Sequence, residues 1–323
     1  MSKVFLAPMD GLVDSLLRDL LTRVGGYDGA VSEFLRVSGT PLPLRSFRRV
    51  CPELDNCSRT RSGTPVVVQL LGSHPERMAE TAARLATLAP VGIDLNFGCP
   101  APTVNRHGGG AMLLDDPELM RRIAQGVRDA VPHTIPVTAK MRLGVRDTGK
   151  TLECARALES GGVASLVVHA RTKIDAYRPP AHWEWIARVR ETVAVPVIAN
   201  GEIWSVGDYD RCREVTGCAD VMIGRGAVAD PFLARRIRAS LDGVLREQPL
   251  DEDWGELLPL VGEFWIRVQQ RVTPRHAPGR LKLWLNSLRR CYPQADILYH
   301  RLRPVNDVQE VGSVLAAQGA SVD

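Results

Sequence analysis

Polar side chains recur at the ends of short apolar stretches throughout this 323-residue sequence. In each stretch, aliphatic residues lead into a group that can exchange a proton or form a strong hydrogen bond. The set comprises Glu33, Arg36, Gln69, Asn96, Cys99, Lys140, Arg142, His169, Arg171, Asn200, Glu202 and Arg225. A single member could be a satisfied polar group in a core. So many members in equivalent positions indicate one shared site.

Cys99 is the most ambiguous of these residues, because it ends the apolar stretch DLNFGCP at 94–100. A thiol there could be a small core residue, a redox group, a metal ligand or a proton donor. The seven cysteines form no CxxC pair and no Cys/His cluster at zinc spacing, so partners for a disulfide or a metal are missing. The metal-ligand and disulfide alternatives therefore lose support, a small core residue and a proton donor stay open for Cys99, and we expect most of the other six to be buried thiols.

Lys140, His169 and Gln69 fit a flat, electron-accepting cofactor. A lysine at the pyrimidine edge of a flavin ring stabilises the negative charge that reduction creates there. The alternative for Lys140 is an ion pair with Glu33 inside the fold. Glycines at 201, 224 and 226 are placed for a phosphate, to which Arg225 would add charge-assisted bonds.

Eight short, branched-aliphatic runs are predicted to be the strands that position these groups. They cover residues 3–9, 29–35, 66–72, 92–98, 137–144, 165–171, 195–201 and 220–226. Helical periodicity separates most of them, as at 75–89, 117–131, 151–162 and 182–193. This alternation predicts a (β/α)8 TIM barrel, with the polar residues on its carboxyl-terminal rim. A doubly wound sheet is less favoured, because APMDGLVD at 7–14 lacks the GxGxxG turn.

The pattern changes after the eighth strand. Residues 231–245 are predicted to be the last barrel helix, and residues 246–323 a small bundle of about four helices, which gives domains at 1–245 and 246–323. Between residues 264 and 303 there are nine Lys or Arg and one acid, Asp296. This basic block indicates a polyanionic partner, or alternatively a solvated helix face.

Composition sets outer bounds on the function. Apolar residues make up 45% and charged residues 24%, with a formal net charge of +4. The sequence has no apolar run long enough to span a membrane, and MSKVFLAPMDG is too short in apolar residues for a signal peptide. We therefore expect a cytoplasmic, monomeric protein with no membrane attachment and no metal.

Eight motifs together resemble the tRNA-dihydrouridine synthase family, and the resemblance spans nearly the whole chain. They are LAPMDG (6–11), VVQLLG (67–72), DLNFGCP (94–100), GGGAMLL (108–114), AKMRLG (139–144), VVHART (167–172), IANGEI (198–203) and MIGRGA (222–227). The segments SEFLRV (32–37), CPEL (51–54), SRTRSG (58–63) and ANGEIW (199–204) are similar to the DusC-like branch, which modifies uridine 16 of the D-loop.

The resemblance implies a role for each matching residue. FMN would be held by Ala7, Pro8, Met9, Gln69, Lys140, Asn200, Gly201, Glu202, Gly224 and Arg225, with His169 beside it. Asn96 would orient the uracil and Cys99 would be the general acid. The tRNA would contact Arg36, Arg142, Arg171, Tyr177, Arg280 and Lys282. Phe97 stands where relatives often have a smaller residue, so we expect it to affect the fit of the base.

The chemistry implied is reduction of the C5=C6 bond of uridine. Hydride from flavin N5 adds to C6, and a thiol that is protonated at neutral pH supplies the proton at C5. NADPH would reduce the flavin, and the target base would be flipped out of the tRNA into the barrel.

Two other functions remain open. One is a small-molecule flavin barrel enzyme, similar to a dihydroorotate dehydrogenase or an ene-reductase. That alternative gives no reason for a basic tail. The other is an RNA-binding protein that has lost catalysis, against which the complete set of rim residues argues.

Overall fold

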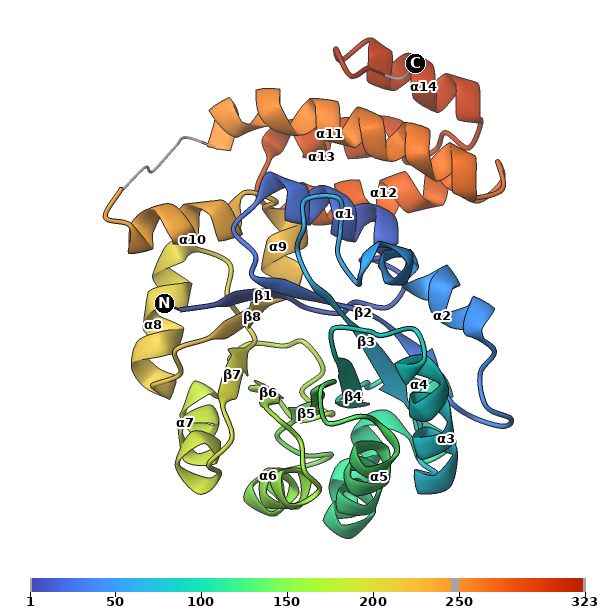
Figure 1. Cartoon of the computed structure of the whole chain (residues 1–323). Coiled ribbons are helices and arrows are strands. Elements are labelled where there is room, and N and C mark those ends of the chain that lie inside the picture. The colour runs from blue at the N-terminus through green and yellow to red at the C-terminus, as the bar shows by residue number, and fades with distance from the viewer. Residues whose placement is uncertain (1, 245–249, 322–323) are drawn as a thin grey trace.

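Eight parallel strands close into a barrel in the computed structural model, which describes residues 2–244 and 250–321 (Figure 1). The strands are β1 (Val4–Leu6), β2 (Gly29–Arg36), β3 (Val66–Leu71), β4 (Ile93–Phe97), β5 (Val137–Arg142), β6 (Leu166–His169), β7 (Val197–Asn200) and β8 (Val221–Ile223). Each lies within or nearly within a predicted run, and β1 pairs with β8 to close the barrel. The predicted TIM barrel is confirmed.

Helices surround the barrel, one or more after each strand. They are α1 (Ser15–Val24), α2 (Leu44–Val50), α3 (Pro75–Ala86), α4 (Pro102–Asn105), α5 (Pro117–Ala130), α6 (Thr151–Ser160), α7 (Trp183–Thr192), α8 (Val206–Thr216), α9 (Arg225–Ala229) and α10 (Leu233–Leu241). Short 3-10 helices cover Pro52–Asn56 and Gly110–Asp115. The helices predicted after strands three, four, five and six of the sequence are α3, α5, α6 and α7, each one to three residues shorter at its ends.

Strand alternation divides the apolar residues into two layers. Outward-facing residues such as Leu95 and Phe97 pack against the helices and form the main core. Inward-facing Ala7, Val31, Val167, Ile198 and Met222 form a smaller cluster inside the barrel. This inner cluster lies inside the barrel near its carboxyl-terminal end. It forms an apolar floor beneath the polar side chains of the rim.

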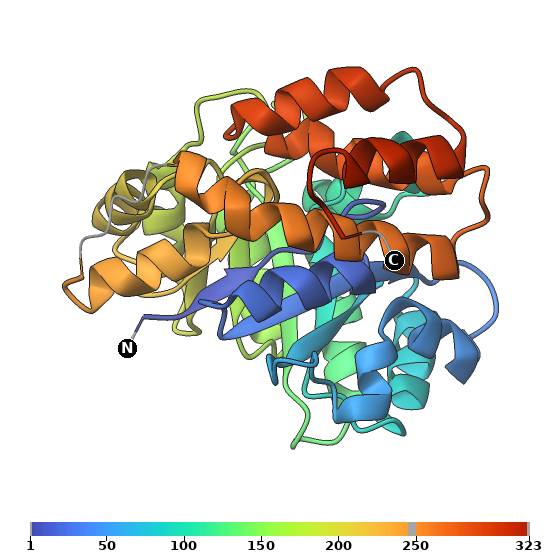
Figure 2. The same cartoon turned by 90° about the horizontal axis from the view of Figure 1, so that it is seen from above.

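Four helices follow the barrel, as predicted: α11 (Leu250–Arg271), α12 (Ala277–Leu288), α13 (Pro293–Leu302) and α14 (Val308–Ala316). They lie together on one side of the barrel, where α11 runs along α1 and α12 contacts α9 (Figure 2). Aromatic packing of Phe264 against Trp284, with ring centroids 4.9 Å apart, joins α11 to α12. The predicted division between 245 and 246 lies outside the described residues.

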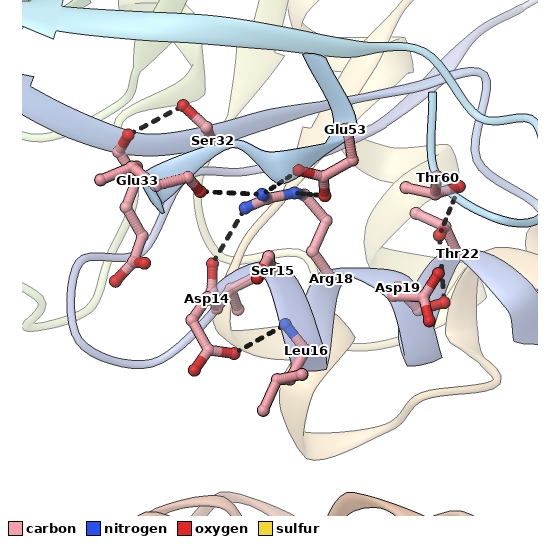
Figure 3. A network of polar contacts seen from close by, with 12 residues as sticks. Asp14, Ser15, Leu16, Arg18, Asp19, Thr22, Ser32, Glu33, Glu53 and Thr60 are labelled. Carbon is pink, nitrogen blue, oxygen red and sulfur yellow. Dashed lines mark hydrogen bonds and ion pairs between the residues drawn. The ribbon is translucent and has the colours of Figure 1, made fainter. Parts of the chain in front are cut away.

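The start of α1 is held by a buried polar network (Figure 3). Arg18, fully buried, forms a bidentate ion pair with Glu53, with Nε–Oε1 and Nη2–Oε2 distances of 2.8 and 2.9 Å. Asp14 caps the helix by accepting from the amides of Leu16 and Leu17. Because α1 follows the loop after β1, this network fixes a loop that enters the site.

Candidate active site

A pocket of about 670 Å³ opens at the carboxyl-terminal ends of the strands. We call it the barrel pocket. Every residue predicted to hold a cofactor lines it: Ala7, Pro8, Met9, Gln69, Lys140, His169, Asn200, Gly201, Glu202, Gly224 and Arg225. Asn96, Cys99, Arg142 and Tyr177 line it as well. Strand register explains the assembly, since Asn96 lies beside Lys140 and His169 beside both Arg142 and Asn200.

Lys140 lies deep in the barrel pocket. Its Nζ donates to Oδ1 of Asn200 at 2.9 Å, and Nδ2 of Asn200 donates to the carbonyl of Met222 at 2.8 Å. Burial, reinforced by the nearby Arg142 charge, lowers the pKa of Lys140 to about 7. The alternative partner, Glu33, instead accepts from the amide of Gly11 at 2.7 Å. Lys140 therefore directs a donor toward the pocket rather than being neutralised by a carboxylate.

A chain of side-chain hydrogen bonds fixes the adjacent wall. Asp94 accepts from Thr138 Oγ1 at 2.6 Å and from Gln69 Nε2 at 2.7 Å, and Gln69 Oε1 accepts from Asn96 Nδ2 at 2.7 Å. Asp94 is almost fully buried, and burial raises its pKa. Because each link specifies which atom donates, Gln69 and Asn96 have defined amide orientations. Asp94 was not among the predicted site residues.

Cys99 stands at the mouth of the pocket. Oδ1 of Asn96 accepts from the amides of Gly98 and Cys99, both at 2.9 Å, and so shapes the turn that carries the thiol. Burial raises the pKa of Cys99 above its ordinary value. The thiol is therefore protonated at neutral pH, which is the state that a proton donor requires.

His169 lies beside Gly201 on the neighbouring strand. Burial, together with the surrounding cationic groups, lowers the pKa of His169 well below its ordinary value, so the ring is neutral at pH 7. Gly201 has φ of +120°, and a Cβ there would lie 2.9 Å from Cδ2 of His169. The close approach of strand and ring therefore requires a glycine.

Aromatic and arginine side chains form the outer rim. The Arg225 guanidinium lies between the rings of Tyr177 and Trp204, 4.7 and 5.1 Å from their centroids. Trp204 Nε1 donates to Glu202 at 2.8 Å, and the guanidinium of Arg290 from the tail lies 3.8 Å from the Trp204 ring centroid. Half of the Tyr177 side chain remains exposed. Stacked groups of this kind suit planar, anionic ligands.

Four of the predicted tRNA contacts form hydrogen bonds within the protein. Arg142 is 2% exposed and Arg171 fully buried, so neither presents its guanidinium to solvent. Arg280 is largely covered, where it pairs with Asp14 at 2.7 Å and donates to the carbonyl of Gly11. Lys282 donates to the Arg303 carbonyl and to Asn306 within the tail.

Buried carbonyls and carboxylates attract these side chains inward, because an arginine can satisfy several acceptors at once. Arg171 donates to the Arg178 carbonyl and pairs with Glu202. Arg36 does reach a cleft, a separate one of about 440 Å³ that it lines with His74 and His107. Sequence reasoning had no signal for the acceptors of Arg171, of which Glu202 lies 31 residues away.

Phe97 does not affect the pocket as expected. It is 1% exposed, belongs to the core between barrel and helices, and is absent from the pocket lining. Side chains alternate along β4, so Asn96 faces the pocket and Phe97 faces the helices. The prediction that Phe97 shapes base binding is therefore wrong.

Several lining residues were not assigned a role. Leu12, Phe34, Lys173 and Trp204 line the barrel pocket, as does Asp10, which follows the first strand. Asp10 and Trp204 stand within the motifs LAPMDG and ANGEIW, which was a usable signal. Lys173 lies in the long segment between β6 and α7, where neither periodicity nor a polar strand end marks it.

A flavin cofactor fits the residues of this pocket. Lys140, Asn200 and Gln69 gather donors and acceptors at its base, where the pyrimidine edge of the ring would be read. Ala7, Met222 and Met9 provide apolar contact, and Arg225 with Gly201 and Gly224 provides space and charge for a phosphate at the rim. The volume lies within the range of roughly 300–1,000 Å³ typical of small-molecule sites. Among the described residues, no group of three or more His, Cys, Asp or Glu is arranged to hold a metal ion.

The fold and this pocket define a TIM-barrel enzyme with its site at the carboxyl ends of the strands. Residues 5–261 match the family described as dihydrouridine synthase (Dus). The chain belongs to the dihydrouridine synthase family, whose members are flavin-dependent oxidoreductases. The family resemblance read from the sequence is confirmed.

Curated relatives match over nearly the whole chain. The tRNA-dihydrouridine(16) synthase of Cupriavidus necator is 58% identical over 98% of this chain and 97% of its own. That of Ralstonia nicotianae is 56% identical over 98% of this chain and 95% of its own. That of Shewanella oneidensis is 45% identical over 97% of both. The similarity includes the tail as well as the barrel.

Two solved structures match three quarters of the chain. The histamine dehydrogenase of Rhizobium sp. 4-9 has a TM-score of 0.54 and 16% identity, covering 75% of this chain and 46% of that one. The 6-hydroxypseudooxynicotine amine oxidase of Pseudomonas geniculata N1 has a TM-score of 0.57 and 15% identity, covering 75% and 48%. At this identity the likeness establishes the fold only.

Proposed function

We propose that this protein reduces uridine to 5,6-dihydrouridine in tRNA, at position 16 of the D-loop, with FMN as cofactor and NADPH as reductant. The observation that carries the proposal is the placement of a protonated thiol, Cys99, at the mouth of a pocket whose base holds Lys140 and Asn200. The specific position rests on the relatives, which are named for it at up to 58% identity.

Each residue of the pocket has a part in holding the cofactor. Lys140 is the residue that would place a positive charge at the pyrimidine edge, with its amine fixed by Asn200. Ala7, Pro8 and Met9 would contact the ring, and Gly201, Glu202, Gly224 and Arg225 would hold the phosphate end. The chemistry that flavin supplies when bound is hydride transfer to C6 of uracil, with NADPH as the source of electrons.

Cys99 completes the reaction by delivering a proton to C5 of the uracil. Its raised pKa keeps the thiol protonated until the base arrives. Asn96 would orient the uracil, since its amide is fixed by Gln69 and by the amides of residues 98 and 99. A serine could not replace the thiol, because a hydroxyl is too weak an acid to release its proton at this stage.

The tRNA must reach the barrel pocket from outside. Of the predicted contacts, Tyr177 is half exposed, and Arg36, Arg280 and Lys282 are partly exposed. Arg142 and Arg171 stay in the proposal through the loops that they hold. We assign residues 1–245 to the FMN-binding catalytic domain and 246–323 to tRNA binding. We also propose that the protein is monomeric and cytoplasmic. The described helices include none long and apolar enough to cross a bilayer.

The decisive experiment maps dihydrouridine in tRNA. Purified protein is loaded with FMN and given NADPH and unmodified tRNA. The product is located by sequencing the tRNA after a chemical treatment that reacts with dihydrouridine and not with uridine. We expect dihydrouridine at position 16 alone. Reduction of orotate or a simple enone without any product in tRNA would favour the small-molecule alternative. A protein that binds tRNA but never yields dihydrouridine would be an RNA-binding protein without catalysis.

A further inference from the structure

Arg142 makes three hydrogen bonds that join two separate loops. Its Nε donates to the carbonyl of Gly98 at 2.9 Å. Its Nη1 donates to the carbonyls of Thr172 and Ala176, at 2.9 and 2.8 Å. Gly98 immediately precedes Cys99, whereas the other two residues belong to the segment between β6 and α7. One guanidinium on β5 therefore holds both sides of the pocket mouth.

The turn that carries Cys99 is restrained at the neighbouring peptide groups too. Asn96 binds the amides of Gly98 and Cys99, while the Cys99 carbonyl accepts from Asn105 Nδ2 and from the amide of Ala111, both at 3.0 Å. The Gly98 carbonyl belongs to the same turn, and Arg142 binds it. The thiol thus stands on a backbone whose position is fixed from several elements.

The opposite loop presents the exposed ring of Tyr177 to the pocket. The Arg142 Cζ lies 5.3 Å from the centroid of that ring, and Arg171 Nε donates to the carbonyl of Arg178 further along the same segment. Two buried arginines from adjacent strand ends therefore hold this loop from beneath. Their hydrogen bonds go to backbone carbonyls and, for Arg171, also to the carboxylate of Glu202.

We propose that Arg142 is a positioning residue that sets the distance between the Cys99 turn and the Tyr177 loop, and so aims the thiol at C5 of the bound base. The inference rests on the proposed role of Cys99 as proton donor. It differs from the sequence-based expectation that Arg142 binds a phosphate of the tRNA. A side chain that is 2% exposed and committed to three carbonyls is poorly placed for a phosphate.

The test compares Arg142→Lys with Arg146→Lys, an exposed arginine in the loop four residues after Arg142. Lysine keeps the charge but cannot reach three separate carbonyls from one ammonium. Rapid mixing measures flavin reduction by NADPH and, separately, flavin oxidation by unmodified tRNA over a range of tRNA concentrations. Melting temperature and flavin content report on folding in both variants.

We expect Arg142→Lys to lower kcat for tRNA reduction by about 100-fold, the effect of roughly 1 Å of misplacement, while KM for tRNA and its salt dependence stay near wild type. Flavin reduction by NADPH should slow far less than this. A raised KM with wild-type kcat would overturn the proposal in favour of a phosphate contact. Arg146→Lys should match the wild type in every measurement.

Asn105→Leu provides an independent second test, because it removes a hydrogen bond from the Cys99 carbonyl without touching Arg142. We expect the same pattern, a lower kcat with an unchanged KM. Wild-type kcat in either variant, once folded, overturns the positioning role. If the wild-type protein itself forms no dihydrouridine, it is the proposed function that fails instead.

Discussion

Replacing Gly201 by alanine tests how closely β7 and β6 must approach for the site to form. Gly201 has φ of +120°, a conformation that costs a residue with a Cβ about 1–3 kcal/mol. The new methyl would also lie 2.9 Å from Cδ2 and 3.3 Å from Nε2 of His169, and overpacking of this kind costs about 1–3 kcal/mol. The His169 ring cannot retreat freely, because it is buried.

Together the two effects amount to about 2–6 kcal/mol of destabilisation. For a chain of this size, about 2 °C of melting temperature is lost per kcal/mol, so Gly201→Ala should melt about 4–12 °C lower. The displaced ring also narrows the barrel pocket, so the purified variant should carry much less flavin. Differential scanning calorimetry and the flavin-to-protein absorbance ratio measure the two effects.

Gly39→Ala is the matched control. A Cβ at residue 39 would meet nothing within 4 Å, so its melting temperature and flavin content should equal those of the wild type. The reasoning would be refuted by a Gly201→Ala protein that melts within about 1 °C of wild type and keeps its flavin. Loss of flavin in both variants would point to a general effect of added methyl groups.

Three further predictions concern the thiol and the buried ion pair. Cys99→Ala should lower the rate of dihydrouridine formation by about 10²–10⁴-fold while flavin still becomes reduced by NADPH, and an unchanged rate in rapid mixing would remove Cys99 as the acid. Because the folded protein raises the pKa of Cys99, the donor form persists above the ordinary thiol pKa of about 8.5. Lys140, whose pKa is about 7, titrates in both proteins, so the test is the ratio of the wild-type rate to the Cys99→Ala rate on tRNA. This ratio should hold as pH rises through about 8.5 and decline only above it, and a ratio that falls below about pH 8 would contradict this. Glu53→Gln leaves the Arg18 charge buried without its partner, which should cost about 3–5 kcal/mol in urea unfolding. The control is Asp55→Asn, which breaks the surface ion pair of Asp55 with Arg48. It should change the free energy of unfolding by less than about 1 kcal/mol.

Much of the site could be read from strand ends. The residues predicted to hold the cofactor all line one pocket, because in a parallel barrel the carboxyl end of every strand meets the same rim. Position along a strand also decides which face a side chain occupies. That rule places Asn96 in the pocket, and it would have placed its neighbour Phe97 among the helices had it been applied there.

For the arginines, position in the sequence did not predict which groups the side chains bind. Arg142 and Arg171 follow strands and carry the charge expected of phosphate ligands, yet both are buried. Their acceptors are carbonyls of residues 98, 172, 176 and 178 and the carboxylate of Glu202. A sequence states that an arginine is present but does not state which distant acceptors will surround it. The same holds for Arg280, which pairs with Asp14 across 266 positions.

The sequence by itself determined the barrel, the order of its strands, the helical tail and the residue types on the rim, because these follow from local periodicity and from the parallel arrangement of strands. Only the tertiary structure decided which polar groups face the pocket and which form hydrogen bonds that hold the surrounding loops in place. Long side chains choose among acceptors that loops from several strands bring together, and that choice depends on the folded geometry around them.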